Sequence, residues 1–186
     1  MSCQVDSITD HFLHPRNVGD AGEPSFVGRA ASLECGATLR VSIQIDESQR
    51  ISEAKFKAAG CNALVGFLSI LTEQVKGLAP VDAAQISQHP EKLSQGMSEK
   101  EPCAKLACQA LLTAIAEYSD AAREEWTGDE ALICTCFFVS ETTIEREIQN
   151  KSLATVAEVT RACSAGGGCG SCHQLIQEIL DSTNEP

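Results

Sequence analysis

The sequence predicts an α+β protein in which helices pack on a small antiparallel sheet, followed by a small and mainly helical second domain. Three observations support this prediction. Residues 41–45 and 51–58 alternate apolar and polar side chains with the period of two expected of strands. Residues 62–76 form an aliphatic segment of helical length. Residues 118–131 then turn polar and acidic and lose their periodicity, which is typical of a domain boundary.

Caps and helical repeats predict the other elements of the first domain. A first helix covers residues 7–14, and two short surface helices cover residues 80–87 and 91–94. A longer helix begins where Ser98 and Glu101 have the spacing of a capping box. Its core face carries the apolar residues at positions i, i+3, i+4 and i+7, which are Cys108, Leu111, Leu112 and Ile115.

Capping signals predict three helices in the second domain. The first follows Ser140, the second follows Thr155, whose partner Glu158 lies at capping-box spacing, and the third follows Ser171. The apolar residues that the first and third helices carry are Ile144, Ile148, Leu175, Ile176 and Ile179.

Length and composition indicate a folded chain with an aliphatic core. Of 186 residues, 43% are hydrophobic but only 4% are aromatic. This length suits a medium and a small domain. We divide it into a first domain of residues 1–120, an acidic linker of residues 121–131 and a second domain of residues 132–186. The formal net charge of −12 repels phosphates and anionic lipids, so we expect neither nucleic acid nor a membrane as partner.

The sequence also indicates a reducing compartment. No segment approaches the ~20 apolar residues of a membrane helix, and the first ten residues do not resemble a signal peptide. We therefore expect a cytoplasmic protein. Ten cysteines are enough for a disulfide framework, but thiols that cluster with glycines in short motifs favour metal binding.

Four cysteines of the second domain form two close pairs, Cys134 with Cys136 and Cys169 with Cys172. Two thiol pairs separated by about two helices of chain are the arrangement that a four-coordinate sulfur site requires. The glycines of residues 166–170 let the backbone turn tightly around a metal centre. Four thiolates suit a structural zinc ion as well as an iron-sulfur cluster, so the residues alone leave both open.

The segments CTCFFVSETTIEREI and LATVAEVTRACSAGGGCGSC, within residues 133–180, resemble the middle domain of NifU and the related bacterioferritin-associated ferredoxin. This resemblance implies a permanent, redox-active [2Fe-2S] cluster, whose ligands are Cys134, Cys136, Cys169 and Cys172. Cys163 lies outside both pairs and is expected to be a buried helix thiol. His173 directly follows Cys172, and we expect it to be exposed at a helix start, with contact to the cluster environment as the alternative.

Three cysteines of the first domain lie at predicted element boundaries. Cys35 lies in the turn ECGA, Cys61 follows Gly60 at a strand-to-helix junction, and Cys103 lies in the first turn of a helix. A helix N-terminus favours the thiolate, the form that binds metal and attacks sulfur, so we expect that form at Cys61 and Cys103. The alternative is three small core residues, since free cysteine is commonly buried.

The first domain resembles the IscU and NifU scaffold family over about residues 7–118. The similarity rests on HPRNVG, the glycine-flanked first cysteine, FKAAGCNA and a helix that ends in AIAEY. It implies an α+β domain in which Cys35, Cys61 and Cys103 converge at one end, bind iron or zinc, and build a transient cluster from iron and the sulfur of a cysteine desulfurase. Cys103 best matches the cysteine that receives sulfur.

Two positions depart from this family's pattern. Ala37 stands where an aspartate usually follows the first cysteine, so a carboxylate that can ligate metal or assist cluster release is missing. Pro102 stands where a histidine usually precedes the third cysteine, which removes a nitrogen ligand. Three thiols are one short of a complete set, so a cluster requires a fourth ligand from solvent, a second subunit or a partner.

The combined pattern predicts a scaffold, not an enzyme, that assembles iron-sulfur clusters and carries a permanent [2Fe-2S] cluster. The expected partners are a cysteine desulfurase, apo iron-sulfur client proteins of nitrogen fixation or of general maturation, and a second copy in a homodimer. The third domain of full-length NifU, with its own Cys-x-x-Cys, is expected to be absent because the chain ends at Pro186. The alternatives are a ferredoxin-like electron carrier with a degenerate docking domain and a structural zinc protein.

Overall fold

The computed structural model describes residues 2–46, 48–94, 97–125 and 130–184. The chain forms two compact units, Met1–Glu117 and Tyr118–Pro186. The boundary falls inside helix α5 (Glu101–Glu125), so the first residues of the expected linker are helical. Residues 126–129 of that linker lie outside the described residues. The domain limits proposed from the sequence therefore stay predictions.

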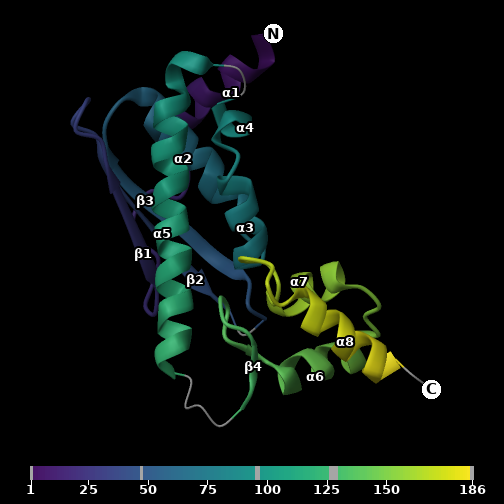
Figure 1. The fold of residues 1–186 in the computed structure, drawn as a ribbon. Helices are drawn as coiled ribbons and strands as arrows, with labels where there is room; N and C mark the ends of the chain where they lie inside the picture. Colours follow the sequence, from purple (N-terminus) through teal and green to yellow (C-terminus); the bar gives the residue numbers. More distant parts are fainter. Residues whose placement is uncertain (1, 47, 95–96, 126–129, 185–186) are drawn as a thin grey trace. The chain divides into compact units, whose positions relative to one another are not determined.

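The first unit contains a three-stranded antiparallel sheet in the order β1-β2-β3 (Figure 1). Its strands are β1 (Phe26–Ala31), β2 (Thr38–Ile45) and β3 (Ile51–Ala59). Both predicted strands and their antiparallel pairing are confirmed, and each is longer than its periodic segment. The sequence did not predict β1, because FVGRAA is short, contains a glycine and has no clear alternation.

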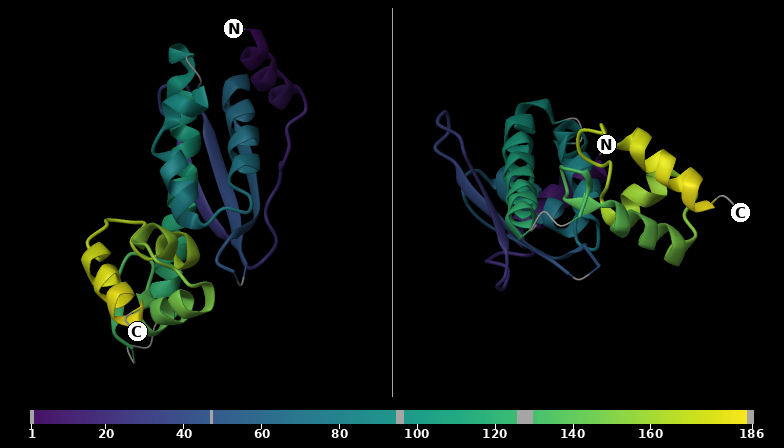
Figure 2. Two further views of the ribbon diagram at one scale, coloured as in Figure 1. Left: turned by 90° about the vertical axis from the view of Figure 1, so that its right-hand side faces the viewer. Right: turned by 60° about the horizontal axis from the view of Figure 1, so that its bottom comes forward.

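Helices cover one face of this sheet, and α2 and α5 lie side by side on it (Figure 2). The helical elements of the first unit besides α5 are α1 (Ser2–Leu13), α2 (Asn62–Gln74), α3 (Pro80–Ser87), α4 (Pro90–Ser94) and the 3-10 turn η1 (Ser98–Lys100). Strand β1 approaches α5 so closely that a Cβ on Gly28 would lie 1.8 Å from the carbonyl oxygen of Ala110. This glycine is therefore required by the packing of β1 on α5.

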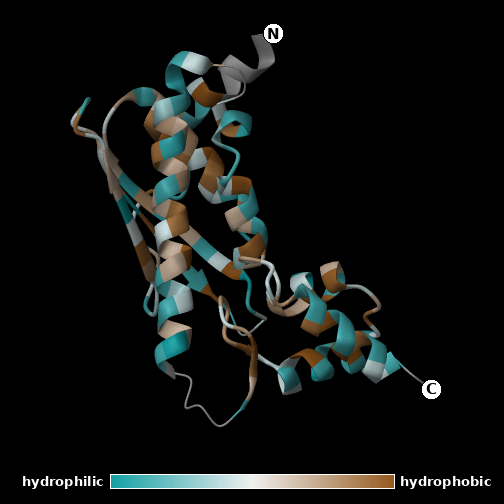
Figure 3. Ribbon diagram, in the orientation of Figure 1, coloured by the Kyte–Doolittle hydropathy of each residue, from teal (hydrophilic) through white to brown (hydrophobic). Residues whose placement is uncertain are grey.

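The start of α5 corrects one sequence prediction. Ser98 opens a 3-10 turn and no side chain caps it, so the predicted capping box with Glu101 is wrong. The α-helix proper begins three residues later. Its predicted core face is confirmed at Cys108, Leu111 and Ile115, which are buried, whereas Leu112 is only partly buried. The alternation of teal and brown along α5 in Figure 3 reflects this division between a polar and an apolar face.

The HPRNVG motif fixes the segment after α1 against the rest of the unit. The backbone N–H of Arg16 donates to the Ser69 hydroxyl on α2 at 2.9 Å. Val18 forms a parallel bridge to Phe56 of β3. The buried His11 of α1 contacts the same Ser69 hydroxyl through Nδ1 at 2.9 Å. In this structure the motif therefore holds α1 and the following chain in place.

The second unit is a small helical domain with a two-stranded ladder. Its elements after α5 are β4 (Leu132–Cys134), β5 (Val139–Ser140), α6 (Glu141–Lys151), α7 (Val156–Cys163) and α8 (His173–Asn184). The predicted caps are confirmed at Ser140 and at the capping box of Thr155 and Glu158. The predicted cap at Ser171 is wrong, because α8 begins at His173 and the Ser171 hydroxyl contacts a cysteine sulfur instead.

A separate hydrophobic core supports the second unit. Its fully buried large side chains are Ile144, Ile148, Ile176 and Leu180. Leu175 is 46% exposed and lies outside this core. Among the described residues, no helix combines the length and the apolar character needed to cross a membrane.

Candidate metal centres

The first unit brings two of its three cysteines into direct contact. Cys61 directly precedes α2, and Cys103 lies in the first turn of α5, as predicted. Their Sγ atoms are 3.2 Å apart although the residues are 42 positions apart in sequence. Cys35 lies on the exposed turn between β1 and β2, close enough for its charge to act on Cys103. Two of the three thiols are thus in contact, and the third is close enough to act on Cys103 electrostatically.

The electrostatics of these thiols differ from the sequence expectation. Burial, and then the hydrogen bond with Cys61, raises the pKa of Cys103 to about 11, so the helix N-terminus does not make this residue a thiolate. The pKa of Cys35 is lowered instead, because the Ser32 side chain and the backbone at Ala37 donate hydrogen bonds to its sulfur. The exposed thiol on the turn is therefore more acidic than the half-buried one on α5.

Ala37 stands at the position where the resembled scaffold family usually has an aspartate. It is only 3% exposed. It packs against the strand-to-helix junction, where a Cβ added to Gly60 would lie 3.1 Å from the Ala37 Cβ. A methyl group therefore occupies the space beside the thiols, and no carboxylate extends from this position.

The second unit assembles its four cysteines from two segments. Cys134 ends β4, and Cys136 follows in the adjacent turn, with its Sγ 3.5 Å from that of Cys169. Cys134 and Cys172 share a side-chain hydrogen bond and are 2% and 6% exposed. Each Cys-x-Cys sulfur thus meets one sulfur of the Cys-x-x-Cys segment. Among the described residues the thiols approach one another in pairs, and no set of three potential ligands stands at metal-binding distances.

The four sulfurs span a wide range of acidity. Hydrogen bonds from the Ser171 side chain and backbone, together with the Cys136 thiol, lower the pKa of Cys169 to about 7. Burial raises the pKa of Cys172 to about 11, and the nearby charge and hydrogen bond of Cys134 add to this. The pKa of Cys136 is raised overall, since burial and the Cys169 thiol outweigh the hydrogen bond from the Cys169 backbone. A thiolate at Cys169 is the form that binds a metal first.

A glycine-rich loop between α7 and α8 makes room for this site. A Cβ on Gly168 would lie 2.8 Å from the Cβ and 2.9 Å from the Sγ of Cys136. Gly166 and Gly170 have φ values of +85° and +74°, which favour glycine. A hydrogen bond from the Gly166 backbone amide acts to lower the pKa of Cys172, against the larger effect of burial. A four-thiol donor set, a loop without side chains and an amide directed at sulfur fit a thiolate-bound [2Fe-2S] group.

The other cysteines are placed outside both sites. Cys163 ends α7, is buried, and its thiol donates to the carbonyl of Val159 at 3.3 Å, which confirms the predicted buried helix thiol. Cys108 is also buried in its core. The side chain of Cys3 lies outside the described residues.

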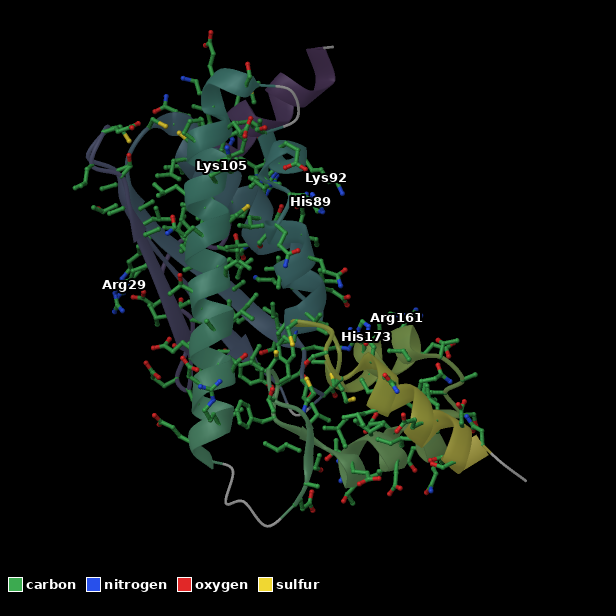
Figure 4. The ribbon with its side chains drawn as sticks, in the orientation of Figure 1. Arg29, His89, Lys92, Lys105, Arg161 and His173 are labelled. Atoms are coloured by element: carbon green, nitrogen blue, oxygen red, sulfur yellow. The ribbon has the colours of Figure 1, made fainter. Side chains whose placement is uncertain are left out.

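His173 adjoins the glycine loop through a contact that the sequence did not specify. The residue is exposed, as expected, and its Nε2 lies 2.7 Å from the carbonyl oxygen of Gly166 (Figure 4). Its position directly after the last cysteine was the available signal.

Comparisons with known proteins divide the chain in a similar way. The family model described as NifU-like N terminal domain matches residues 4–125, and the model described as BFD-like [2Fe-2S] binding domain matches residues 132–182. A nitrogen fixation protein NifU of Trichormus azollae is 34% identical over 97% of this chain. The chain spans about three fifths of the length of such NifU relatives, 64% in this case and 59% for that of Azospirillum brasilense.

Relatives of the first unit alone are also found. The iron-sulfur cluster assembly scaffold protein IscU of Haemophilus influenzae is 34% identical over 61% of this chain and 93% of its own length. A crystal structure of a candidate SUF-system scaffold protein from Fervidobacterium islandicum superposes with a TM-score of 0.53, at 17% identity, over 62% of this chain and 99% of its own. This structural likeness confirms the predicted α+β fold. Because the first family model covers more than half of the chain, the protein belongs to the family of the NifU-like N-terminal domain, and a segment that matches the BFD-like [2Fe-2S] binding domain follows it.

Proposed function

We propose that the protein is an iron-sulfur cluster assembly scaffold. In this proposal the first unit builds a transient cluster from iron and from sulfur delivered by a cysteine desulfurase, and then passes it to apo-proteins. The observation that carries the proposal is the 3.2 Å contact between the Cys61 and Cys103 sulfurs, with Cys35 on the adjacent exposed turn. Family membership of residues 4–125 supports it.

The ligands of the transient cluster are proposed to be Cys35, Cys61 and Cys103. Cys35 and Cys61 are exposed, so a cluster bound there is accessible to a donor or an acceptor protein. An apolar cavity of about 560 Å³ adjoins Cys61, and its lining also includes Met97 and Lys100. A fourth ligand must come from solvent, a partner or a second copy of the chain, and the proposal includes a homodimer for this reason.

The second unit is proposed to hold a resident [2Fe-2S] cluster through Cys134, Cys136, Cys169 and Cys172. When bound, such a cluster supplies one-electron redox chemistry. The chain's own residues bury two of the sulfurs and leave Cys169 exposed, so that one edge of the group stays accessible. Because both units belong to one chain, the effective concentration of this redox group at the first unit is high.

The remaining parts of the proposal concern partners and compartment. We infer a cysteine desulfurase and apo iron-sulfur proteins as partners, and no catalytic turnover by the chain itself. Ten cysteines with functional thiols call for a reducing compartment such as the cytoplasm.

Desulfurase-driven reconstitution under anaerobic conditions tests the proposal. The chain is incubated with iron, cysteine and a cysteine desulfurase, and the assembled cluster is then offered to an apo-ferredoxin. Cys35→Ala, Cys61→Ala and Cys103→Ala should each abolish transfer. Cys108→Ala is the matched control, because it removes a buried thiol from α5, the helix that also carries Cys103. Transfer that persists in all three variants would refute the scaffold function.

A second candidate function is a ferredoxin-like electron carrier with a docking domain. It is favoured by Ala37 and by the pKa of about 11 at Cys103, which keeps that thiol protonated at neutral pH. A chain that reduces a redox partner but never delivers a cluster to an apo-ferredoxin would support this function over the scaffold.

A further inference from the structure

The side chain of His173 closes the glycine loop of the second unit. His173 is the first residue of α8, and Figure 4 shows it beside the loop that precedes this helix. Its Nε2 is 2.7 Å from the carbonyl oxygen of Gly166, seven residues earlier. A carbonyl oxygen only accepts hydrogen bonds, so Nε2 must carry the proton and donate it.

The imidazole ring also fills the space that two glycines leave. A Cβ on Gly166 would lie 2.8 Å from Cδ2 of His173, and a Cβ on Gly170 would lie 3.3 Å from its Cε1. Both glycines have positive φ, so the loop turns sharply at each end of this contact. One ring therefore contacts both ends of the loop.

Gly166 connects this contact to a sulfur. Its carbonyl oxygen accepts from His173, while its amide donates to Cys172. The Thr160 hydroxyl donates to the carbonyl of the preceding residue, Ala165, at 2.7 Å. The peptide groups on both sides of Gly166 are thus held by side chains, which fixes the direction of the Gly166 amide.

We propose that His173 is a positioning residue that holds the Gly166 amide against the Cys172 sulfur and so sets the reduction potential of the group bound by the four thiols. The inference rests on the resident cluster of the proposed function. An N–H···S hydrogen bond stabilises the reduced, more negatively charged state of a thiolate-bound cluster. Loss of the His173 contact frees the loop, weakens this bond and makes the cluster harder to reduce.

Two substitutions that differ by one methylene test the inference. His173→Gln places an amide N–H near the position of Nε2. His173→Asn places its amide N–H near the position of Nδ1, and this shorter side chain cannot reach Gly166. Gln174→Asn shortens the exposed neighbouring side chain in α8 by the same methylene and is the control. The full-length chain is purified anaerobically, and its reduction potential is measured by spectroelectrochemistry.

His173→Asn should shift the potential to a more negative value, and His173→Gln and Gln174→Asn should leave it close to the wild-type value. Deuterium exchange of the peptide that contains residues 164–172 should also be several-fold faster in His173→Asn alone. Equal potentials and equal exchange in the two His173 variants overturn the inference. The exchange measurement needs no cluster, so it still decides on the contact if the chain binds none, which would instead be a failure of the proposed function.

Discussion

The two cysteine sites are built on opposite principles. In the second unit Cys134 and Cys172 are nearly inaccessible, and the glycine loop packs closely against Cys136. In the first unit Cys35 and Cys61 are exposed at element boundaries, and three thiols leave one ligand position to be supplied from elsewhere. A closed four-thiol site is suited to keeping a cluster, and an open three-thiol site is suited to exchanging one.

The acidity of the thiols does not account for this difference. Each site combines one exposed thiol of lowered pKa, Cys35 or Cys169, with one less accessible thiol whose pKa is raised to about 11, the half-buried Cys103 or the buried Cys172. Both sites therefore offer a thiolate that binds first and a second sulfur that loses its proton on binding. The number of sulfurs and their enclosure must then separate a resident from a transient cluster.

The largest expected contrast is in chelator resistance. After anaerobic reconstitution and addition of EDTA, iron should leave the first unit at least about ten-fold faster than the second, because only the second unit has four proposed protein ligands. Visible absorbance and circular dichroism followed over time give both rates. Indistinguishable rates for the two sites would contradict the contrast between an open and a closed site.

Matched glycine substitutions should affect the two sites unequally. In Gly168→Ala the new methyl group would lie 2.8 Å from the Cβ of Cys136, so a proposed ligand must move. In Gly60→Ala it would meet the end of the Leu64 side chain at 2.8 Å and the methyl of Ala37 at 3.1 Å.

We expect Gly168→Ala to lose most of the iron of the resident cluster. Gly60→Ala should keep that cluster and lower the stability of the first unit by about 1–3 kcal/mol, the usual cost of overpacking. Iron per chain and thermal unfolding measure the two effects. A Gly168→Ala protein with the full iron content would show that the loop does not enclose the site.

The buried methyl of Ala37 allows a sharper test of the open site. In Ala37→Asp a carboxylate next to Cys35 can compete with the thiolates for iron, so the transient cluster should be lost several-fold faster. Ala37→Asn has nearly the same shape without the charge and serves as the control. If the two variants lose the cluster at equal rates, packing at this position and not a carboxylate ligand controls release.

The smallest expected effect concerns α7, one of the helices that support the four-thiol site. Thr155→Ala removes the capping box of α7 and should lower the stability of the second unit by about 1 kcal/mol. Hydrogen bonds from the Ala154 backbone and the Thr155 side chain lower the pKa of Glu158. The contribution of the Glu158 carboxylate to the stability of the second unit is therefore fully present above the unfolded-state pKa near 4.5. It is lost as the pH falls through the folded-state pKa. Urea unfolding between pH 3 and 7 should show the stability difference between the wild type and Thr155→Ala narrowing at low pH, where the bond from the Thr155 hydroxyl to the Glu158 carboxylate is lost. The part of the difference due to the Glu158 amide, which donates to the same hydroxyl, should remain.

The sequence predicted those structural features that depend on neighbouring residues and missed those that depend on distant ones. The caps at Ser140 and Thr155 and the apolar face at Leu111 depend on neighbouring residues only, and they are confirmed. Strand β1 depends on the approach of Gly28 to Ala110, 82 positions later in the chain, which no local pattern encodes. Ser171 resembles a helix cap locally, but the sulfur of Cys169 competes for its hydroxyl.

The sites show the same division. The boundary positions of Cys61 and Cys103 were readable from the sequence, but their contact and the burial that raises the pKa of Cys103 arise from tertiary packing. Spacing alone allows Cys136 to meet either sulfur of the Cys-x-x-Cys segment. The fold decides that it meets Cys169. The contact of His173 with Gly166 depends on the sharp turns of the glycine loop, which the sequence permits but does not specify.

The central claim is that one site keeps a cluster while the other exchanges one. An iron, sulfide and zinc count with a visible spectrum on anaerobically isolated protein tests it most directly. The wild type is compared with a triple variant in which Cys35, Cys61 and Cys103 are alanine, and with a quadruple variant in which Cys134, Cys136, Cys169 and Cys172 are alanine. We predict about two iron and two sulfide per chain in the wild type and the triple variant, and none in the quadruple variant as isolated. A colourless wild type that contains zinc, or a triple variant that has lost its colour, would contradict the claim.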